Sequence, residues 1–279
     1  MKKLNIILSI IFFISLLGGT TYSKAATNPL SVHVINVGQG DSIFIKALTG
    51  ETILVDAGKS GTTVVNYLKK QKVSTLTAVV STHPDADHVG GLDEVLKAFN
   101  VKSVYAPKVS HTTQAFKNFL TAVKNEKLTI KTAQNGVVIP DKDKNTEIKF
   151  IAPVKSYAKS DLNNWSGVLM VKHGSKKVLL TGDAELQSEN DMLAKKLLSK
   201  VDVLKVGHHG AKTSSSAKLL SIAKPTYSAI SVGKNSYGHP TSETIKRLTA
   251  IKSKIYRTDK SGNIIFTSNG KSITIKTVK

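Results

Sequence analysis

The sequence predicts an α/β protein in which a pair of β-sheets lies between outer layers of helices. Short β-branched runs alternate with helix-like segments along nearly the whole chain after residue 30, the pattern of mixed α/β architectures. The chain has two strand-rich halves, and no Pro-, Gly- or Ser-rich linker is long enough to separate two domains. Loops at the strand ends can then converge on a site between the sheets.

In the first half, β-branched runs bounded by turn residues predict strands, and apolar residues at helical spacing predict helices. The predicted strands are 32–37, 42–45, 52–55, 77–81, 103–105 and 128–130, and the predicted helices are 62–70, 92–99 and 114–124. Residues 141–145 alternate Asp with Lys and are expected to form a charged hairpin tip.

The second half repeats the pattern. Its predicted strands are 148–151, 167–172, 178–180, 203–206, 226–231, 254–256, 263–267 and 272–276, and its predicted helices are 187–198, 215–222 and 242–248. His173 falls in a strand-to-hairpin segment and is expected at the surface.

Residues 1–25 have the layout of a secretory signal peptide. Lys2 and Lys3 precede an apolar stretch at 6–17, and a small-residue site follows at 23–25. This stretch is shorter than the roughly 20 residues that span a bilayer, so an uncleaved membrane anchor is the weaker alternative. We expect a secreted, extracellular mature domain at 26–279 without a stable membrane span.

The 279 residues include 40 Lys plus Arg, 19 Asp plus Glu and no Cys. Without Cys, thiolate catalysis, disulfides and Cys-ligated metals are excluded, so any metal must bind His, carboxylate or amide groups. Removing the three lysines of residues 1–25 from the net charge of +21 leaves +18, which favours a polyanionic partner.

Several kinds of anionic partner would be attracted to a chain of this charge. Nucleic acid, an anionic cell-wall polymer and anionic lipid all would be, and the simpler alternative is that lysine serves as the solubilising residue. Arg247 and Arg257 are the only arginines, so binding to DNA would be directed at the backbone and tolerant of sequence.

The densest group of potential metal ligands is HPDADH at 83–88, directly after an apolar strand and before a Gly-Gly turn. Burying ionised carboxylates without a cation is costly, and a divalent metal removes that cost. The alternative is a solvated loop in which Asp85 or Asp87 caps a helix. Two further predicted strands end in potential ligands, Asp183 and the pair His208–His209, and this repeated placement favours a metal site.

Four motifs occur in order: VGQGDS at 37–42, HPDADH at 83–88, TGD at 181–183 and HHG at 208–210. With KTSSS at 212–216, GHP at 238–240 and YRTD at 256–259, they cover nearly the whole mature chain. Together they resemble the metallo-β-lactamase fold, and specifically its subgroup formed by the extracytoplasmic C-terminal domain of the DNA-uptake competence protein ComEC. The resemblance implies a four-layer αββα sandwich with one or two divalent metal ions at the sheet edge.

The resemblance also implies six metal ligands: His83, Asp85, Asp87, His88, Asp183 and His208. The first two would face one metal and the next two the other, with Asp183 bridging both and His208 completing the second site. His209 would lie behind the ligands or contact substrate, with an exchange of roles between the two histidines left open. Asp56 would support the metal-binding loop.

Two departures from the family pattern are shared by the competence subgroup. Asp85 stands where most members have His, and NNWS at 163–166 stands where another His is expected. Fewer imidazoles shift the expected metal from zinc towards manganese, with magnesium possible, at least at the first site.

For such a centre, we expect a metal-activated water to attack a phosphodiester. Asp87 or Asp183 would hold that water, and His239 would contact the phosphate or protonate the leaving oxygen. The residues expected to line the substrate site are Gln39, Asp41, Asn164, His209, Lys212, Ser214 and Ser215. Helix capping is an equal alternative for the serines.

These features predict a secreted metal-dependent hydrolase, and more specifically a nuclease that cleaves extracellular DNA. One alternative is hydrolysis of another ester, lactone or phosphoester, because a fold does not dictate its substrate. The other is a non-catalytic cationic protein that binds DNA or the cell envelope, and the charge is compatible with electrostatic association with the cell wall.

Overall fold

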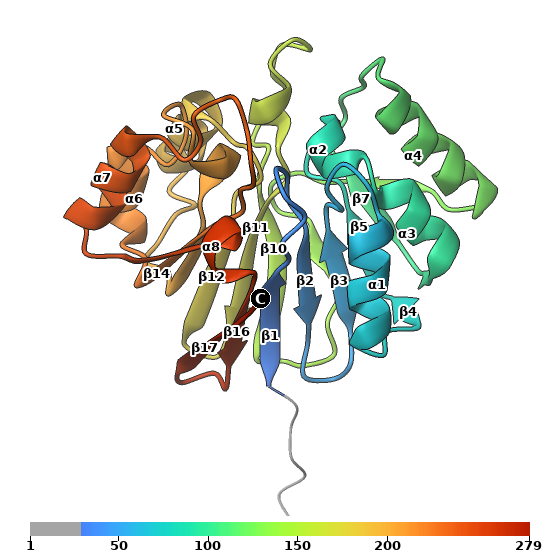
Figure 1. Cartoon of the computed structure of the whole chain (residues 1–279), viewed down its shortest axis with the longest axis horizontal. Helices are drawn as coiled ribbons and strands as arrows, with labels where there is room; N and C mark the ends of the chain where they lie inside the picture. The colour runs from blue at the N-terminus through green and yellow to red at the C-terminus, as the bar shows by residue number, and fades with distance from the viewer. Residues whose placement is uncertain (1–28) are drawn as a thin grey trace, which may run out of the picture.

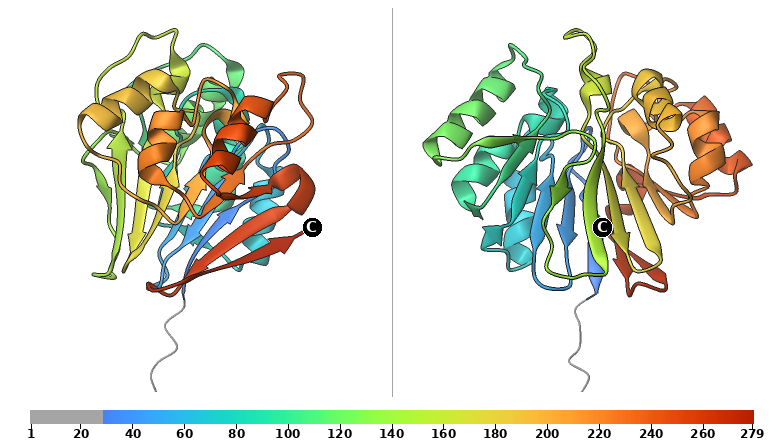
Figure 2. Two further views of the ribbon diagram at one scale, coloured as in Figure 1. Left: turned by 90° about the vertical axis from the view of Figure 1, so that its left-hand side faces the viewer. Right: turned by 180° about the vertical axis from the view of Figure 1, so that it is seen from behind.

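The computed structural model describes residues 29–279, and the predicted signal peptide lies outside these residues. Two sheets stand face to face, with helices on both outer surfaces (Figure 1). Figure 2 shows the same outer helical layers from behind. The order helix, sheet, sheet, helix confirms the predicted αββα sandwich. Within residues 29–279, no helix is long and apolar enough to cross a bilayer.

The first sheet has eight strands in the order β17-β16-β1-β2-β3-β5-β7-β8. They are β1 (Leu30–Val34), β2 (Ile43–Lys46), β3 (Thr52–Val55), β5 (Ala78–Val80), β7 (Val104–Ala106), β8 (Ile130–Thr132), β16 (Asn263–Ser268) and β17 (Ile273–Val278). The strands β3, β5, β7 and β8 pair in parallel, so their carboxyl ends share one edge.

The second sheet has seven strands in the order β15-β14-β13-β12-β11-β10-β9. They are β9 (Val138–Ile139), β10 (Thr146–Ala152), β11 (Val168–His173), β12 (Lys176–Leu180), β13 (Val203–Lys205), β14 (Tyr227–Ile230) and β15 (Lys254–Arg257). The strands β12 to β15 are parallel. A separate two-stranded ladder joins β4 (Thr75–Leu76) to β6 (Asn100–Val101).

The helices divide between the halves of the chain. The first half contains α1 (Thr62–Lys70), α2 (Ala86–Val89), α3 (Leu92–Ala98) and α4 (Gln114–Asn125). The second half contains α5 (Leu186–Ala194), α6 (Ala217–Ala223), α7 (Ser242–Ala250), α8 (Thr258–Ser261) and the 3₁₀ turns η1 (Leu162–Trp165) and η2 (Gly207–Gly210).

Three apolar cores hold the layers together. The central core lies between the sheets, where Val34 and Ile45 of the first share a cluster with Phe150 and Leu180 of the second. A second core joins the first sheet to α1, α3 and α4, and a third joins the second sheet to α5, α6 and α7. Because both faces of each sheet are covered, inner strands such as Thr52–Val55 are buried along their whole length.

Most predicted elements are confirmed, with shifted ends. β9 and β10 pair antiparallel, so residues 141–145 do connect a hairpin. The predicted helix at 187–198 ends at Ala194, and Lys196 follows with a positive φ of 55° that a helix cannot contain. The expectation that His173 lies at the surface is wrong: the side chain is buried, and its Nδ1 lies 2.9 Å from Ser268 Oγ of β16.

Candidate metal centre

Loops from both sheets meet at the edge where the parallel strands end, near the labels α2 and α5 at the upper end of Figure 1. His83 and His88 follow β5, Asp183 follows β12, and His209 follows β13. The carboxyl ends of parallel strands are where α/β folds place their ligands. The centre therefore combines side chains from both halves of the chain.

Three imidazole rings gather around the Asp183 carboxylate. Asp183 Oδ2 lies 3.2 Å from His88 Nε2 and 3.3 Å from His209 Nε2. His83, His88 and Asp183 offer ligand atoms that lie within 4.8 Å of one another. Among the described residues, the Nε2 atoms of His83, His88 and His209 are buried and have no hydrogen-bond partner. Buried unpaired nitrogens beside a carboxylate fit a divalent cation, which would satisfy them as ligands.

The opposite ring nitrogens are held in place. His88 Nδ1 lies 2.8 Å from Asp56 Oδ2, and His209 Nδ1 lies 2.9 Å from the Ser231 carbonyl oxygen. Asp56 is itself fixed, because it accepts hydrogen bonds from both the backbone N–H and the hydroxyl of Thr82. A donating Nδ1–H leaves Nε2 as the electron-pair donor, so these contacts orient both rings for a metal. Asp56 thus lies where the resemblance implied a supporting role.

Asp85 and Asp87 lie at the rim of the cluster. Asp85 Oδ2 is 3.4 Å from His83 Nε2, and Asp87 Oδ2 is 3.4 Å from His209 Nε2. Their side chains are 35% and 24% exposed, so they face the solvent opening of the otherwise buried group. Asp85 precedes α2, but its side chain makes no capping hydrogen bond, which leaves its oxygens free to bind a cation.

The two adjacent histidines of η2 occupy different places, and both have positive φ angles, of 47° and 52°. His209 has a 2% exposed side chain and joins a group of potential ligands with Asp87 and His88. The His208 side chain is 25% exposed, and its Nε2 lies 3.8 Å from Asp183 Oδ2. His208 Nδ1 instead contacts Glu185 Oε1 at 3.0 Å. By geometry His209 is the inner ring and His208 the outer one.

Lys205 is a component that the sequence analysis did not single out. Within residues 29–279 it is the only buried lysine, and it comes from the end of β13. Its ammonium forms an ion pair with Asp41, donates a hydrogen bond to the Gly182 carbonyl at 3.1 Å and lies 3.7 Å from Asp183 Oδ1. The only signal in the sequence was a single charged residue in an otherwise apolar strand.

Electrostatic coupling in the cluster is strong. Although burial opposes it, Asp183 and Asp56 raise the pKa of His88 well above its usual value, and Asp183 likewise raises the pKa of His209 despite burial. Burial also opposes the shift at Asp183, where His209 and His88 hold the carboxyl pKa well below its usual value. Against burial, Lys205 and His209 lower the pKa of Asp41. These shifts favour ionised carboxylates and protonated imidazoles, so a bound cation would have to displace protons from His88 and His209.

Among the predicted substrate residues, Asn164 is committed to the fold. Its Oδ1 accepts hydrogen bonds from the backbone N–H groups of Glu185 and Ser188 at the start of α5. The neighbouring Asn163 instead contacts the centre, with Nδ2 3.4 Å from His208 Nδ1. In the same segment, Ser166 Oγ accepts a hydrogen bond from the Asp183 backbone N–H and lies 3.5 Å from His83 Nδ1.

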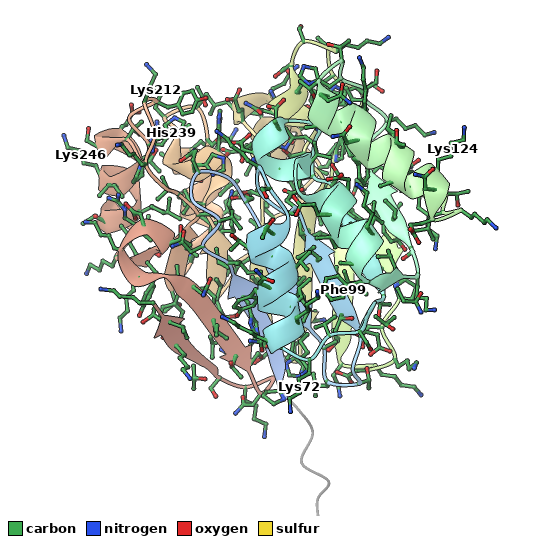
Figure 3. All side chains as sticks on the ribbon, turned by 45° about the vertical axis from the view of Figure 1, so that its right-hand side comes forward. Lys72, Phe99, Lys124, Lys212, His239 and Lys246 are labelled. Carbon is green, nitrogen blue, oxygen red and sulfur yellow. The ribbon has the colours of Figure 1, made fainter. Side chains whose placement is uncertain are left out.

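The remaining predicted residues lie at varied depths. Ser214 and Ser215 are buried, and Ser215 Oγ accepts a hydrogen bond from the backbone N–H of Gly207, so it braces η2. Gln39 Oε1 accepts a hydrogen bond from Gly233, which ties the β1–β2 loop to the segment after β14. Lys212 is exposed, and Figure 3 shows it on the same upper end of the molecule as His239. The His239 ring lies 5.3 Å from the His208 ring.

A four-layer αββα sandwich with a His and Asp cluster at the sheet edge is the arrangement of the metallo-β-lactamase fold. The family described as "Metallo-beta-lactamase superfamily" matches residues 35–234, and the chain belongs to this superfamily of metal-dependent hydrolases. A solved structure of a metal-dependent hydrolase of the beta-lactamase superfamily aligns with a TM-score of 0.53 and 16% identity over 84% of this chain and 98% of that chain.

The chain is 31% identical to Competence protein ComA of Neisseria gonorrhoeae over 90% of this chain and 34% of the relative. It is 30% identical to ComE operon protein 3 of Bacillus subtilis over 84% of this chain and 32% of the relative. It is 31% identical to Recombination protein 2 of Haemophilus influenzae over 84% of this chain and 28% of the relative. The chain therefore spans about a third of the length of these relatives. These matches confirm the resemblance to the competence subgroup.

Proposed function

We propose that this protein is a metal-dependent phosphodiesterase that cleaves DNA outside the cell. The observation that carries the proposal is the cluster of three histidines around Asp183, all with buried and unpaired Nε2 atoms, two of which lie 3.2 and 3.3 Å from its carboxylate. The net charge of +18 that remains without residues 1–25 supports a polyanionic substrate, and the similarity to competence-related proteins supports DNA. The backbone of DNA, rather than its base sequence, would be the main source of affinity.

We assign ligands to two metal positions. The first is formed by His83, Asp85 and Asp183, and the second by Asp87, His88, Asp183 and His209. The ligands combine imidazole nitrogens with carboxylate oxygens, which suits zinc or manganese, with magnesium as a further candidate at the oxygen-rich first position.

The residues of the centre divide the chemical work. A bound divalent cation would act as the Lewis acid that activates water and offsets charge on the phosphoryl oxygens. Asp87, at the exposed rim, accepts a hydrogen bond from the attacking water and orients it toward the phosphorus. The Nδ1 atom of His208 lies 3.0 Å from Glu185 Oε1, and His208 donates a proton to the leaving oxygen. Burial and the neighbouring His208 lower the pKa of His239, so we assign it substrate contact rather than proton donation.

Localisation is a separate part of the proposal. The lysines, apolar stretch and small-residue site in residues 1–25 favour secretion through a cleaved signal peptide. The charge of the mature chain favours electrostatic retention near anionic cell-wall polymers. Comparing the N-terminal sequence of the protein in the culture medium with that in the cell tests this part: a chain beginning near Ala26 in the medium supports it, and an intact Met1 contradicts it.

The test of the activity is a comparison of substrate classes. Metal-stripped full-length protein is given Mn²⁺, Zn²⁺ or Mg²⁺ and offered supercoiled plasmid DNA, a carboxylic ester, a lactone and a β-lactam. The matched controls are Asp183→Ala, in the centre, and Asp259→Ala, a surface aspartate paired with Arg257. Metal-restored plasmid cleavage that only Asp183→Ala lacks supports the proposal. Cleavage of the ester or lactone alone would assign a different hydrolase activity, and tight DNA binding without any hydrolysis would assign a binding protein.

A further inference from the structure

Tyr237 is the most exposed of the large apolar side chains in residues 29–279. It is 68% exposed, and the other exposed members of this class in the described chain are all aliphatic. An aromatic face left open to solvent next to a polar site is a feature that needs an explanation, because burial of a tyrosine ring elsewhere would be favourable.

The loop that carries Tyr237 is rigidly built. The Asn235 side chain accepts hydrogen bonds from the backbone N–H groups of Tyr237 and His239, at 3.1 and 3.0 Å. Its amide group donates to the carbonyl oxygens of Gly233 and His239, at 2.8 and 2.9 Å. These four hydrogen bonds of one side chain fix the loop backbone, so the position from which the Tyr237 side chain extends is set by the fold before any ligand binds.

From this ring, a line of aromatic rings leads into the metal centre. The Tyr237 centroid lies 5.6 Å from that of His239, and the planes are only 31° apart. His239 lies 5.3 Å from His208, and His208 lies 6.0 Å from the inner ligand His209. Tyr237 is therefore the outer end of a continuous aromatic path that begins at the reacting centre. A flat group placed against it would be held close to a phosphate bound at the metals.

A second exposed apolar side chain follows a residue that contacts the path. Leu186 is 47% exposed and directly follows Glu185, whose carboxylate contacts His208. Its backbone N–H donates to the Thr213 carbonyl, in the segment after η2. Tyr237 and Leu186 are thus exposed apolar residues joined to His208 through His239 and Glu185. Binding of the charged phosphate backbone of DNA alone would require neither side chain.

We propose that Tyr237, together with the His239 ring beneath it, is a stacking platform for a nucleobase of single-stranded DNA. This inference rests on the proposed nuclease function and specifies its substrate. A base in a duplex presents only its edges, whereas an unpaired base offers its face to an aromatic side chain. Stacking is tolerant of sequence, which agrees with a chain that has only two arginines for reading bases. Tyr237 is a binding residue in this scheme and touches no reacting atom.

The experiment compares two oligonucleotides that share a backbone. One is an ordinary single-stranded DNA, and the other carries abasic residues throughout. Full-length wild type, Tyr237→Ala and Tyr237→Trp are compared in KM and kcat with the restored metal, and in Kd by fluorescence anisotropy in EDTA, where turnover is prevented. Circular dichroism melting verifies that each variant is folded, which the exposed position of the side chain favours.

We expect Tyr237→Ala to raise KM and Kd for ordinary DNA about tenfold, equivalent to ~1.4 kcal/mol, with little change in kcat. The same variant should leave the abasic strand unaffected, and Tyr237→Trp should bind ordinary DNA as tightly as wild type. Equal losses on both strands, or no loss on either, would overturn the platform. If wild type cleaves neither strand, the nuclease proposal fails, and the Kd values still decide whether Tyr237 binds bases.

Discussion

Lys205 and Asp41 form a fully buried ion pair at the candidate metal centre, although one comes from the second sheet and the other from a loop of the first. Asp41 belongs to the loop between β1 and β2, and Lys205 ends β13. The ammonium also faces Asp183 Oδ1, so Asp183 presents Oδ2 to the histidines and Oδ1 to a fixed positive charge. The pair therefore joins the two sheets and offsets part of the negative charge gathered at the centre.

Replacing Lys205 should show how much free energy is lost when the Asp41 carboxylate is buried without a cation. Lys205→Met leaves Asp41 buried without its partner, and we expect a loss of about 3–5 kcal/mol in the free energy of unfolding. Urea denaturation in EDTA measures it. Lys205→Met/Asp41→Asn removes both charges and should recover much of the loss. A single variant as stable as wild type would show that the pair contributes nothing to folding.

Asp56 should control metal affinity through His88. In Asp56→Ala the His88 ring loses its 2.8 Å partner, so its Nε2 is no longer fixed toward the centre. We expect metal affinity to fall by about 10–100-fold, the usual effect of losing a carboxylate behind a histidine ligand. Competition with a chromophoric chelator gives the dissociation constant. Unchanged affinity in a folded Asp56→Ala protein would contradict the role.

Substitutions of the two histidines of η2 should have different effects, one on metal binding and the other on turnover. His209 is the inner ring, so His209→Ala should lower bound metal per chain as measured by plasma mass spectrometry. His208 lies farther from Asp183 and contacts Glu185, so His208→Ala should keep its metal and lose most of its kcat. The reverse pattern would assign the ligand role to His208.

His33, remote from the centre, should make stability depend on pH. Burial, reinforced by Lys46, lowers its pKa from 6.5 to about 4, and its ring nitrogens contact Tyr67 and Ser31. At pH 7 the ring is neutral in both states. As pH falls below 6.5, the unfolded chain takes up a proton that the folded chain refuses until about pH 4, so stability is lost across that window.

The pH effect can be isolated by substitution. Between pH 7 and pH 5, the free energy of unfolding of wild type should fall by about 2 kcal/mol more than that of His33→Gln. Urea denaturation of both proteins in EDTA at the two pH values gives the difference. If the stability gap between the two proteins stays constant with pH, the buried-neutral assignment of His33 is incorrect.

The elements that deliver ligands could be predicted because their signals are local. An apolar strand followed by His, Asp or Gly is visible in sequence, and β5, β12 and β13 all have this form. Short elements such as β4, β6, α2 and α8 were not predicted, because two to four residues carry too little pattern and are fixed by tertiary contacts.

The side chains around the ligands could not be predicted in the same way. Lys205 is buried because Asp41 approaches from far along the sequence, and strand periodicity does not encode that partner. Which of His208 and His209 lies deeper depends on two consecutive positive φ angles, which direct the adjacent side chains to different depths. Asn163 and Asn164 differ for a similar reason, since η1 directs one to His208 and the other to the start of α5.

We propose that side chains from both halves of the chain form one metal-dependent phosphodiesterase centre. This proposal is tested most directly by incubating metal-stripped full-length protein with end-labelled single-stranded DNA during a Mn²⁺ titration, alongside Asp183→Ala and the surface control Asp259→Ala. We expect cleavage that rises with metal occupancy in wild type and in the control and that is lost in Asp183→Ala. Confirmed metal binding without any cleavage of DNA, by all three proteins alike, would contradict it.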